Sequence, residues 1–129
     1  MKDMILSLVM LFAPTEFDCL AQNVYYEARN QPIEGQLAVA DVTLNRVEDP
    51  RWPDTICGVV EQKNQFSWVG NVSEKPKGKA WRRAKEVALH SLMNSNRISA
   101  TYFHADYVSP DWAENKKRVK KIKNHIFYA

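Results

Sequence analysis

Two consecutive helical patterns constrain the fold of this chain more than any other feature. From residue 16 to residue 29, apolar side chains recur at the i, i+3, i+4 and i+7 positions of an amphipathic helix, at Phe17, Leu20, Ala21, Val24 and Ala28. A second helix is expected over residues 33–47, where apolar residues lie on more than one side. Such a helix is buried from several directions. The sequence therefore predicts a helical domain built around its second helix.

Residues with known preferences for helix ends set the limits of these segments. Thr15 can cap the first helix, and the Gln31-Pro32 step ends it because the residue before a proline is pushed out of the helical region. After a loop rich in prolines and acids, Asp54 or Thr55 can cap a short helix that runs to residue 60. A further amphipathic helix is expected over residues 79–93. The regular structure predicted up to this point is therefore helical.

The last third of the chain favours short strands instead. Aromatic and β-branched residues at 101–104 and 122–128 predict two strands, arranged as a hairpin closed by the loop around Pro110. Residues 65–68 are expected to form a short extended piece. The predicted fold class is therefore α+β, mainly α, with a small β-sheet or hairpin.

Length and composition indicate one folded domain. The chain has 129 residues, of which 45% are hydrophobic, and this is enough for a real core. We assign residues 16–129 to this domain. The apolar run MILSLVMLFA at 4–13 is too short to cross a bilayer as a helix. Residues 1–15 are therefore expected to be an N-terminal apolar segment, either packed on the domain or acting as an uncleaved export signal.

The two cysteines, Cys19 and Cys57, leave two states open. They can form one disulfide bridge or remain two buried thiols, because pairing depends on geometry and on the redox compartment. They are too few for a disulfide scaffold and lack the local spacing of a zinc site.

The formal net charge of +3 is unevenly distributed. Six cations fall within eight positions near the C-terminus: Lys116, Lys117, Arg118, Lys120, Lys121 and Lys123. A solvated face is the simpler interpretation of this basic stretch. If it binds a partner, an anionic envelope surface of wall polymers or lipid headgroups fits it as well as nucleic acid does. No motif that reads nucleic acid accompanies it, so we expect no nucleic-acid partner.

Glu27 is the first candidate for a catalytic residue. Its helical phase places it beside Leu20 and Val24, at the edge of the apolar stripe and in the last turn of its helix. Partial desolvation and the negative end of the helix dipole both raise the pKa of a carboxyl group, which favours the protonated form that a general acid needs. On its position alone, however, Glu27 is more simply an ordinary boundary glutamate paired with Arg29 or another cation.

Aromatic and amide side chains are unusually frequent for so short a chain. Sugar-binding clefts use flat apolar faces together with hydrogen-bonding groups. Candidates for binding or supporting roles are Tyr26, Gln65, Phe66, Ser67, Tyr102, His104 and Trp112. Taken singly, each aromatic residue is more often part of a core, and His104 can equally be a structural histidine.

Several ordered sequence blocks resemble one known family. The longest is NVYYEARNQPIEGQ at 23–36, which continues as AVADVTLNRV at 38–47. The blocks WPDTICGVV at 52–60, QFS at 65–67, YFH at 102–104, VSPDW at 108–112 and HIFY at 125–128 follow in order. Together they resemble the SleB/CwlJ-type cell-wall hydrolase family, with its spore-cortex-lytic-enzyme-like catalytic domain, and ordered blocks are more specific than one short motif.

The resemblance implies a fold, a reaction and a role for Glu27. It implies a lysozyme-like domain of the goose-lysozyme or soluble lytic transglycosylase type, which cuts the glycosidic bond between N-acetylmuramic acid and N-acetylglucosamine in peptidoglycan. The catalytic glutamate of the family, in its Glu-Ala-Arg block, corresponds to Glu27. Tyr26 and Asn30 stand where many relatives carry glycine, which alters the wall of the cleft.

The compact catalytic unit resembles a phage endolysin for a thin-walled host more than a spore-cortex enzyme. The expected setting is therefore the cell wall in the periplasm, reached after release or export from the host cytoplasm. We expect a monomer that lyses the host cell and needs no cofactor and no metal.

Two routes of glycan cleavage remain open. Hydrolysis by a muramidase usually needs two carboxylates. The family resemblance offers lytic transglycosylation, in which one glutamate protonates the leaving oxygen and then accepts the proton of the muramyl C6 hydroxyl. Glu34, Asp41 and Asp106 give no signal comparable to that of Glu27. The sequence therefore favours transglycosylation, with 1,6-anhydromuramyl ends as product.

Two other classes of function compete with this one. A zinc amidase would use His90, His104 and His125, but these residues lack the paired spacing of a zinc helix. A non-catalytic wall-binding or virion protein with the same fold is the other alternative.

Overall fold

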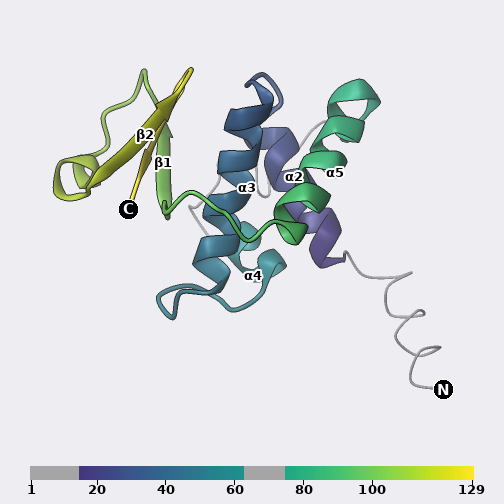
Figure 1. Cartoon of the computed structure of the whole chain (residues 1–129), viewed down its shortest axis with the longest axis horizontal. Helices are drawn as coiled ribbons and strands as arrows, with labels where there is room; N and C mark the ends of the chain where they lie inside the picture. Colours follow the sequence, from purple (N-terminus) through teal and green to yellow (C-terminus); the bar gives the residue numbers. More distant parts are fainter. Residues whose placement is uncertain (1–14, 63–74) are drawn as a thin grey trace.

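The computed structural model describes residues 15–62 and 75–129 as a group of helices beside a small sheet (Figure 1). The elements are the helices α2 (Glu16–Ala28), α3 (Ile33–Val47), α4 (Ile56–Glu61) and α5 (Gly78–Met93), the strands β1 (Tyr102–Ala105), β2 (Arg118–Ile122) and β3 (His125–Tyr128), and the 3-10 helix η1 (Asp111–Asn115) between β1 and β2. The mainly helical α+β class predicted from the sequence is confirmed.

The starts of α2 and α4 follow the expected capping chemistry. The Thr15 hydroxyl accepts a hydrogen bond from the backbone N–H of Asp18 at 3.0 Å, which caps α2. Of the two candidates for the cap of α4, the structure selects Thr55, whose hydroxyl accepts from the N–H of Gly58 at 2.9 Å. The predicted helix bounds are correct to within one residue for α2, α3 and α5.

Helix α3 is the centre of the molecule, as its two-sided apolar pattern predicts. One side, with Ala40 and Leu44, packs in a core shared with α2, α4 and α5. Another side, with Val39 and Val42, packs in a second core that includes Phe127 of β3. Figure 1 shows α3 between the other helices and the sheet. The helix therefore fixes the position of the sheet relative to α2.

The antiparallel pairing predicted between the strand at 101–104 and the last strand is confirmed, but the sheet has a third strand. Its strand order is β1-β3-β2, and both pairs are antiparallel. The prediction of one strand over 122–128 is wrong, because the chain turns at Lys123, where φ is 48°, and Ile122 already belongs to β2. The loop around Pro110 therefore joins β1 to β2, which are not neighbours. The missed strand β2 lies in the basic stretch, where charged side chains hide the strand pattern.

Polar residues of α3 hold the segment that leads into the sheet. The Asn45 side-chain amide donates to the carbonyls of Ile98 and Ala100 at 2.7 and 2.9 Å. The Asp41 carboxylate accepts from the N–H of Ile98 at 3.2 Å. Burial raises the pKa of Asp41, and these contacts show that its role is structural. The chain entering β1 is thereby fixed on α3.

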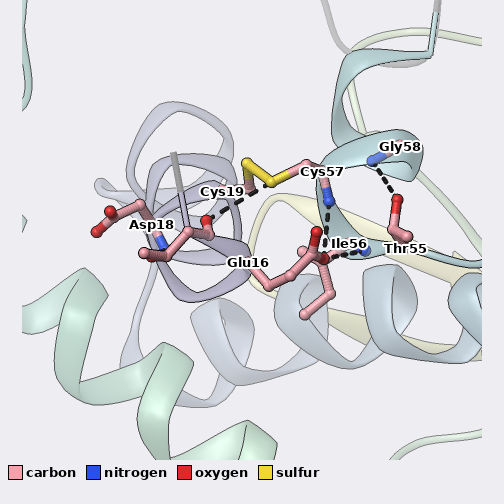
Figure 2. The surroundings of a disulfide bond; sticks show 8 residues. Glu16, Asp18, Cys19, Thr55, Ile56, Cys57 and Gly58 are labelled. Carbon is pink, nitrogen blue, oxygen red and sulfur yellow. Dashed lines mark hydrogen bonds between the residues drawn. A yellow bond between two sulfur atoms is a disulfide. The ribbon is translucent and has the colours of Figure 1, made fainter. Parts of the chain in front are cut away.

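Cys19 and Cys57 form a disulfide bond, which decides between the two states left open by the sequence (Figure 2). The bond joins the first turns of α2 to α4. Beside it, the Glu16 carboxylate accepts hydrogen bonds from the backbone N–H groups of Ile56 and Cys57 at the start of α4. The beginning of the helix that carries Glu27 is therefore held by both a covalent and a polar contact.

Two sequence predictions lie outside the described residues. These are the N-terminal apolar segment, apart from residue 15, and the extended piece at 65–68. In the part of the chain that the structure describes, no helix is both long enough and apolar enough to cross a membrane.

Removing the disulfide bond should destabilise the fold strongly. The bond spans a sequence separation of 38 residues, and the chain-entropy model then gives a loss of about 4 kcal/mol in the free energy of unfolding. Urea denaturation of the variant with both Cys19→Ser and Cys57→Ser measures this loss. A reductant should destabilise the wild type and leave the double variant unchanged. Equal midpoints of unfolding for the wild type and the double variant would contradict the prediction.

Candidate active site

Glu27 lies in the last turn of α2, half-buried at the edge of a cavity of about 280 Å³. Its carboxylate oxygen Oε1 is buried from solvent. The cavity lies between the end of α2 and one edge of the sheet, and its lining comprises Tyr26, Glu27, Arg29, Asn30, Gln31, Ala105, Tyr107, Asn124 and His125. The position matches the partly desolvated carboxyl group expected from the sequence.

Polar contacts join the two sides of this cavity. The Gln31 side-chain oxygen accepts from the N–H of Asn124 at 3.3 Å, which links the corner after α2 to the turn between β2 and β3. Next to it, Lys120 of β2 forms an ion pair with Glu34 of α3 at 2.6 Å. The sheet thus forms the wall of the cavity opposite Glu27, and contacts with α3 fix the position of the sheet.

Arg46, in the last turn of α3, is a buried cation. The residue is only 5% exposed to solvent. Burial lowers the pKa of Arg46 to about 10, against the opposing effects of Tyr102 and Glu27, which raise it. The guanidinium therefore stays charged at neutral pH and interacts electrostatically with the carboxylate of Glu27. The burial of Arg46 was not predicted, because a cation in the last turn of a helix is usually solvated.

Three of the predicted binding residues lie in one aromatic cluster. Tyr102 and His104 are on the same side of β1, and the ring of Trp112 lies 5.1 Å from that of Tyr102 and 5.6 Å from that of His104. Sequence reasoning missed two further members, Trp52, whose ring is 5.6 Å from Tyr102, and Tyr128, 5.3 Å from Trp112. The cluster presents several half-buried rings at the surface of the sheet.

His104 is engaged through both ring nitrogens. Nδ1 lies 2.7 Å from the carbonyl oxygen of Ala105, and Nε2 lies 2.8 Å from the hydroxyl of Tyr128. Because a carbonyl can only accept, Nδ1 carries the proton and Nε2 accepts from the tyrosine. His104 is thus held in place by two neighbours, and its role in binding stays a prediction.

The predicted residues therefore form two groups. Tyr26 and Glu27 share the cavity, whereas Tyr102, His104 and Trp112 share the aromatic cluster. Arg46 belongs with the aromatic cluster, because its guanidinium carbon is 5.5 Å from the centre of the Tyr102 ring. The other predicted residues, Gln65, Phe66 and Ser67, lie outside the described residues.

His125 is a further cavity residue that the sequence did not identify as part of the site. It is 7% exposed, packs against the ring of Phe103, and has a buried Nδ1 without a hydrogen-bond partner. Burial lowers the pKa of His125. The nearby His104 lowers this pKa further, whereas Asp106 raises it. The alternation of β3, which turns Phe127 and His125 to the same inner side, was the signal that could have shown its burial.

The arrangement of the histidines does not resemble a zinc centre. His90 lies on α5, and the strand register turns His104 and His125 to opposite sides of the sheet. Within residues 15–62 and 75–129, no group of three or more His, Cys, Asp or Glu side chains could hold a metal ion.

Comparison with known proteins identifies the family. A family model described as Cell Wall Hydrolase matches residues 30–128. The chain belongs to the cell wall hydrolase family. It is 30% identical to the spore cortex-lytic enzyme of Bacillus subtilis over 122 residues, and 36% identical to that of Halalkalibacterium halodurans over 118 residues. Each match covers 90% of this chain but only 38% and 35% of these relatives, so the chain spans less than half of their length.

Solved structures of cell wall hydrolases show the same fold. The catalytic domain of the germination-specific lytic transglycosylase SleB from Bacillus anthracis superposes with a TM-score of 0.78 at 30% identity, over 92% of this chain and 97% of that one. The catalytic domain of the Bacillus cereus SleB protein gives a TM-score of 0.76 at 30% identity, over 88% and 89%. The lysozyme-like fold of the lytic transglycosylase type, implied by the sequence resemblance, is confirmed.

Burial of His125 should make the domain less stable in mild acid. An unfolded histidine binds a proton below a pH of about 6.5, whereas the buried imidazole resists protonation. The unfolded chain therefore gains protons first, and the free energy of unfolding declines as the pH falls from that value through the lower pKa of the folded state.

Urea denaturation at pH 7 and pH 5 measures the decline in the wild type and in His125→Phe. The phenylalanine keeps the ring packing against Phe103 but cannot be protonated, so its decline should be smaller. Asp41 titrates in both proteins and cancels in the comparison. The same decline in both proteins would contradict the assignment.

Proposed function

We propose that the chain cleaves the glycosidic bond between N-acetylmuramic acid and N-acetylglucosamine in peptidoglycan, with Glu27 as general acid. The observation that carries the proposal is the half-buried carboxyl group of Glu27 at the edge of a cavity, in a chain of the cell wall hydrolase family. The relative from Bacillus anthracis is named a lytic transglycosylase, which supports the same class of reaction here. From the edge of the cavity, Glu27 would donate a proton to an oxygen that enters it.

The finer proposal is lytic transglycosylation. Glu27 donates its proton to the glycosidic oxygen as the bond from C1 of the muramyl residue to that oxygen breaks. The resulting carboxylate accepts the proton of the C6 hydroxyl, whose oxygen bonds to C1 and closes a 1,6-anhydro ring. Glu27 is then protonated again and the atoms balance without water. Among the described residues that line the cavity, Glu27 is the sole carboxylate, which favours this route over two-carboxylate hydrolysis by a muramidase.

The aromatic cluster is proposed as a platform for sugar rings, on the side of the sheet opposite to His125. Trp52, Tyr102 and Trp112 offer apolar faces, which stack on the flat sides of sugars. The ammonium of Lys116 lies 4.5 Å from the centre of the Tyr102 ring and adds positive charge beside the platform.

The basic stretch is proposed to bring the enzyme to an anionic envelope surface. Lys120 and Lys121 form ion pairs with Glu34 and Asp106, at 2.6 and 3.5 Å. The neighbouring cations Lys117, Arg118 and Lys123 are solvent-exposed. Positive charge on this edge of the sheet would raise the local concentration of the enzyme at an anionic polymer.

The proposed setting is the cell wall, outside the reducing cytoplasm, where a phage endolysin would lyse its host. The disulfide between Cys19 and Cys57 supports this setting, because such bonds persist in oxidising compartments.

Glu27→Gln should abolish cleavage, because an amide has no acidic proton to donate. Purified sacculi are digested with the wild type and with the variant, and the products are analysed by mass spectrometry. The wild type should release 1,6-anhydromuramyl ends, and the rate of the variant should fall at least ~100-fold.

The outcomes of this experiment distinguish the type of reaction from the role of Glu27. Reducing muramic acid ends from the wild type would replace transglycosylation by muramidase hydrolysis. If the wild type cleaves stem peptides and leaves the glycan intact, and if a chelator abolishes this activity, the result would favour an amidase. Equal activity of Glu27→Gln would refute the role of Glu27, and no activity of the folded wild type would favour a non-catalytic wall-binding protein.

Trp112→Ala should weaken substrate binding more than it slows the chemical step. Loss of one aromatic contact is worth ~0.5–1.5 kcal/mol, so KM should rise roughly 2- to 12-fold with little change in kcat. Trp112→Phe, which keeps a ring, should restore most of the affinity. Leu89→Ala, at an exposed position of α5, serves as the surface control. An unchanged KM in Trp112→Ala would contradict the proposal that the aromatic cluster binds the substrate.

A further inference from the structure

His125 has a buried polar atom for which the described residues provide no hydrogen bond. The residue is 7% exposed, and its Nδ1 is buried without a partner among them. Almost every buried side-chain nitrogen or oxygen in a folded protein is hydrogen-bonded, because an unpaired one loses its contact with water without replacement. An apolar ring would fill the same space without this cost. A histidine at this position is therefore explained best by a partner that arrives with a ligand.

Packing against apolar side chains holds the imidazole in place. Its centre lies 5.1 Å from that of the Phe103 ring and 6.2 Å from that of the Phe127 ring. In the sheet, His125 pairs with Ala105 of β1 and with Ile122 of β2. None of these four side chains carries a hydrogen-bonding group. The packing therefore fixes the ring and leaves its polar capacity unused.

The ring lines the same cavity as Glu27. Glu27 lies at the end of α2, whereas His125 belongs to the sheet that forms the opposite wall. Of the other polar residues of this wall, Asn124 uses its backbone N–H to bond the Gln31 side chain, and Tyr107 is 84% exposed. The cavity has a volume of about 280 Å³. A sugar unit whose linkage reaches Glu27 would therefore also contact His125.

The imidazole is neutral at pH 7, because burial lowers the pKa of His125 below its usual value of about 6.5. The neutral ring carries one N–H group and one free lone pair. Such a ring pairs with an uncharged amide or hydroxyl group rather than with an ion. Ala105, its partner in the strand register, also lines the cavity and adds apolar surface beside it. The wall thus matches a group that combines an amide with a methyl, as an acetamido group does.

We propose that His125 is a substrate-binding residue that holds the acetamido group of the muramyl residue bound in the Glu27 cavity. The imidazole hydrogen-bonds to the amide, and the acetyl methyl packs against Ala105. Because the acetamido group is attached at C2, next to C1, this contact sets the distance of the scissile bond from Glu27. The inference rests on the proposed function, because the N-acetylated sugar is that of the peptidoglycan strand proposed above.

Binding of two forms of one ligand tests this contact. The ligands are a muramyl-containing tetrasaccharide with its acetamido groups and the same tetrasaccharide after de-N-acetylation. Both are titrated calorimetrically into Glu27→Gln, which does not cleave them. Adding His125→Phe should raise Kd for the acetylated ligand roughly 2- to 12-fold, because one hydrogen bond is lost. Kd for the de-N-acetylated ligand should stay unchanged, because the group that His125 holds is absent.

Two further variants serve as controls in the same background. His125→Gln keeps an amide that donates and accepts, and it should recover part of the affinity for the acetylated ligand. His90→Phe makes the same exchange as His125→Phe at an exposed position of α5, and it should change neither Kd. An equal loss of affinity for both ligands in His125→Phe would overturn the inference, because the residue would then act through packing alone. An unchanged Kd for the acetylated ligand would overturn it too.

A second measurement needs no variant of His125. Its ring nitrogens give their own signals in nitrogen-correlated NMR spectra of Glu27→Gln. At saturation, the acetylated tetrasaccharide should shift these signals, because a new hydrogen bond changes the chemical shift of the nitrogen that forms it. The de-N-acetylated form should not shift them. Signals that respond equally to both ligands, or to neither, would overturn the inference even if His125→Phe does not fold.

The proposed function and this inference can fail separately. If the wild type leaves sacculi intact while the acetylated ligand still binds through His125, the binding site stands and the proposed catalysis is wrong. If the wild type cleaves sacculi while His125→Phe leaves Kd for the acetylated ligand unchanged, the catalysis stands and the role of His125 is wrong.

Discussion

The burial of α3 on two sides is the constraint on which the rest of the structure depends. One side closes the helical core, with Ala40 and Leu44, and another packs against the sheet, with Val39 and Val42. The polar side chains of a helix in this position have little access to water, so they must form hydrogen bonds within the protein. They do so by holding the segment that enters β1. The same contacts that stabilise α3 therefore place the sheet beside the end of α2.

The site is a consequence of this arrangement. The end of α2 faces the sheet edge across a cavity, and Glu27 lies at that boundary because its helical phase places it between the core and the solvent. The disulfide and the Glu16 contacts fix the opposite end of α2 to α4. A carboxyl group at the end of a fixed helix keeps its direction, and such preorganisation is what proton transfer to a bound substrate requires.

Much of the fold follows from local sequence signals, and the parts that do not have physical reasons. The helices could be predicted from apolar periodicity and capping residues, because both signals act within a few residues. The strand β2 was missed because its exposed cations mask the alternation, and the turn at Lys123 has a polar residue in a left-handed conformation. Glu27 was found by its phase and its sequence block. The burial of Arg46 depends on contacts between distant segments, which periodicity does not encode.

The central claim is that the proton of Glu27 meets a glycosidic oxygen in the cavity between α2 and the sheet. A crystal structure of the Glu27→Gln variant with a muramyl-containing tetrasaccharide tests it most directly, because the bound chain would not be cleaved. The account predicts the scissile oxygen within hydrogen-bond reach, ~3 Å, of the side chain at position 27. A glycan bound in a groove from which this side chain cannot reach any glycosidic oxygen would contradict it.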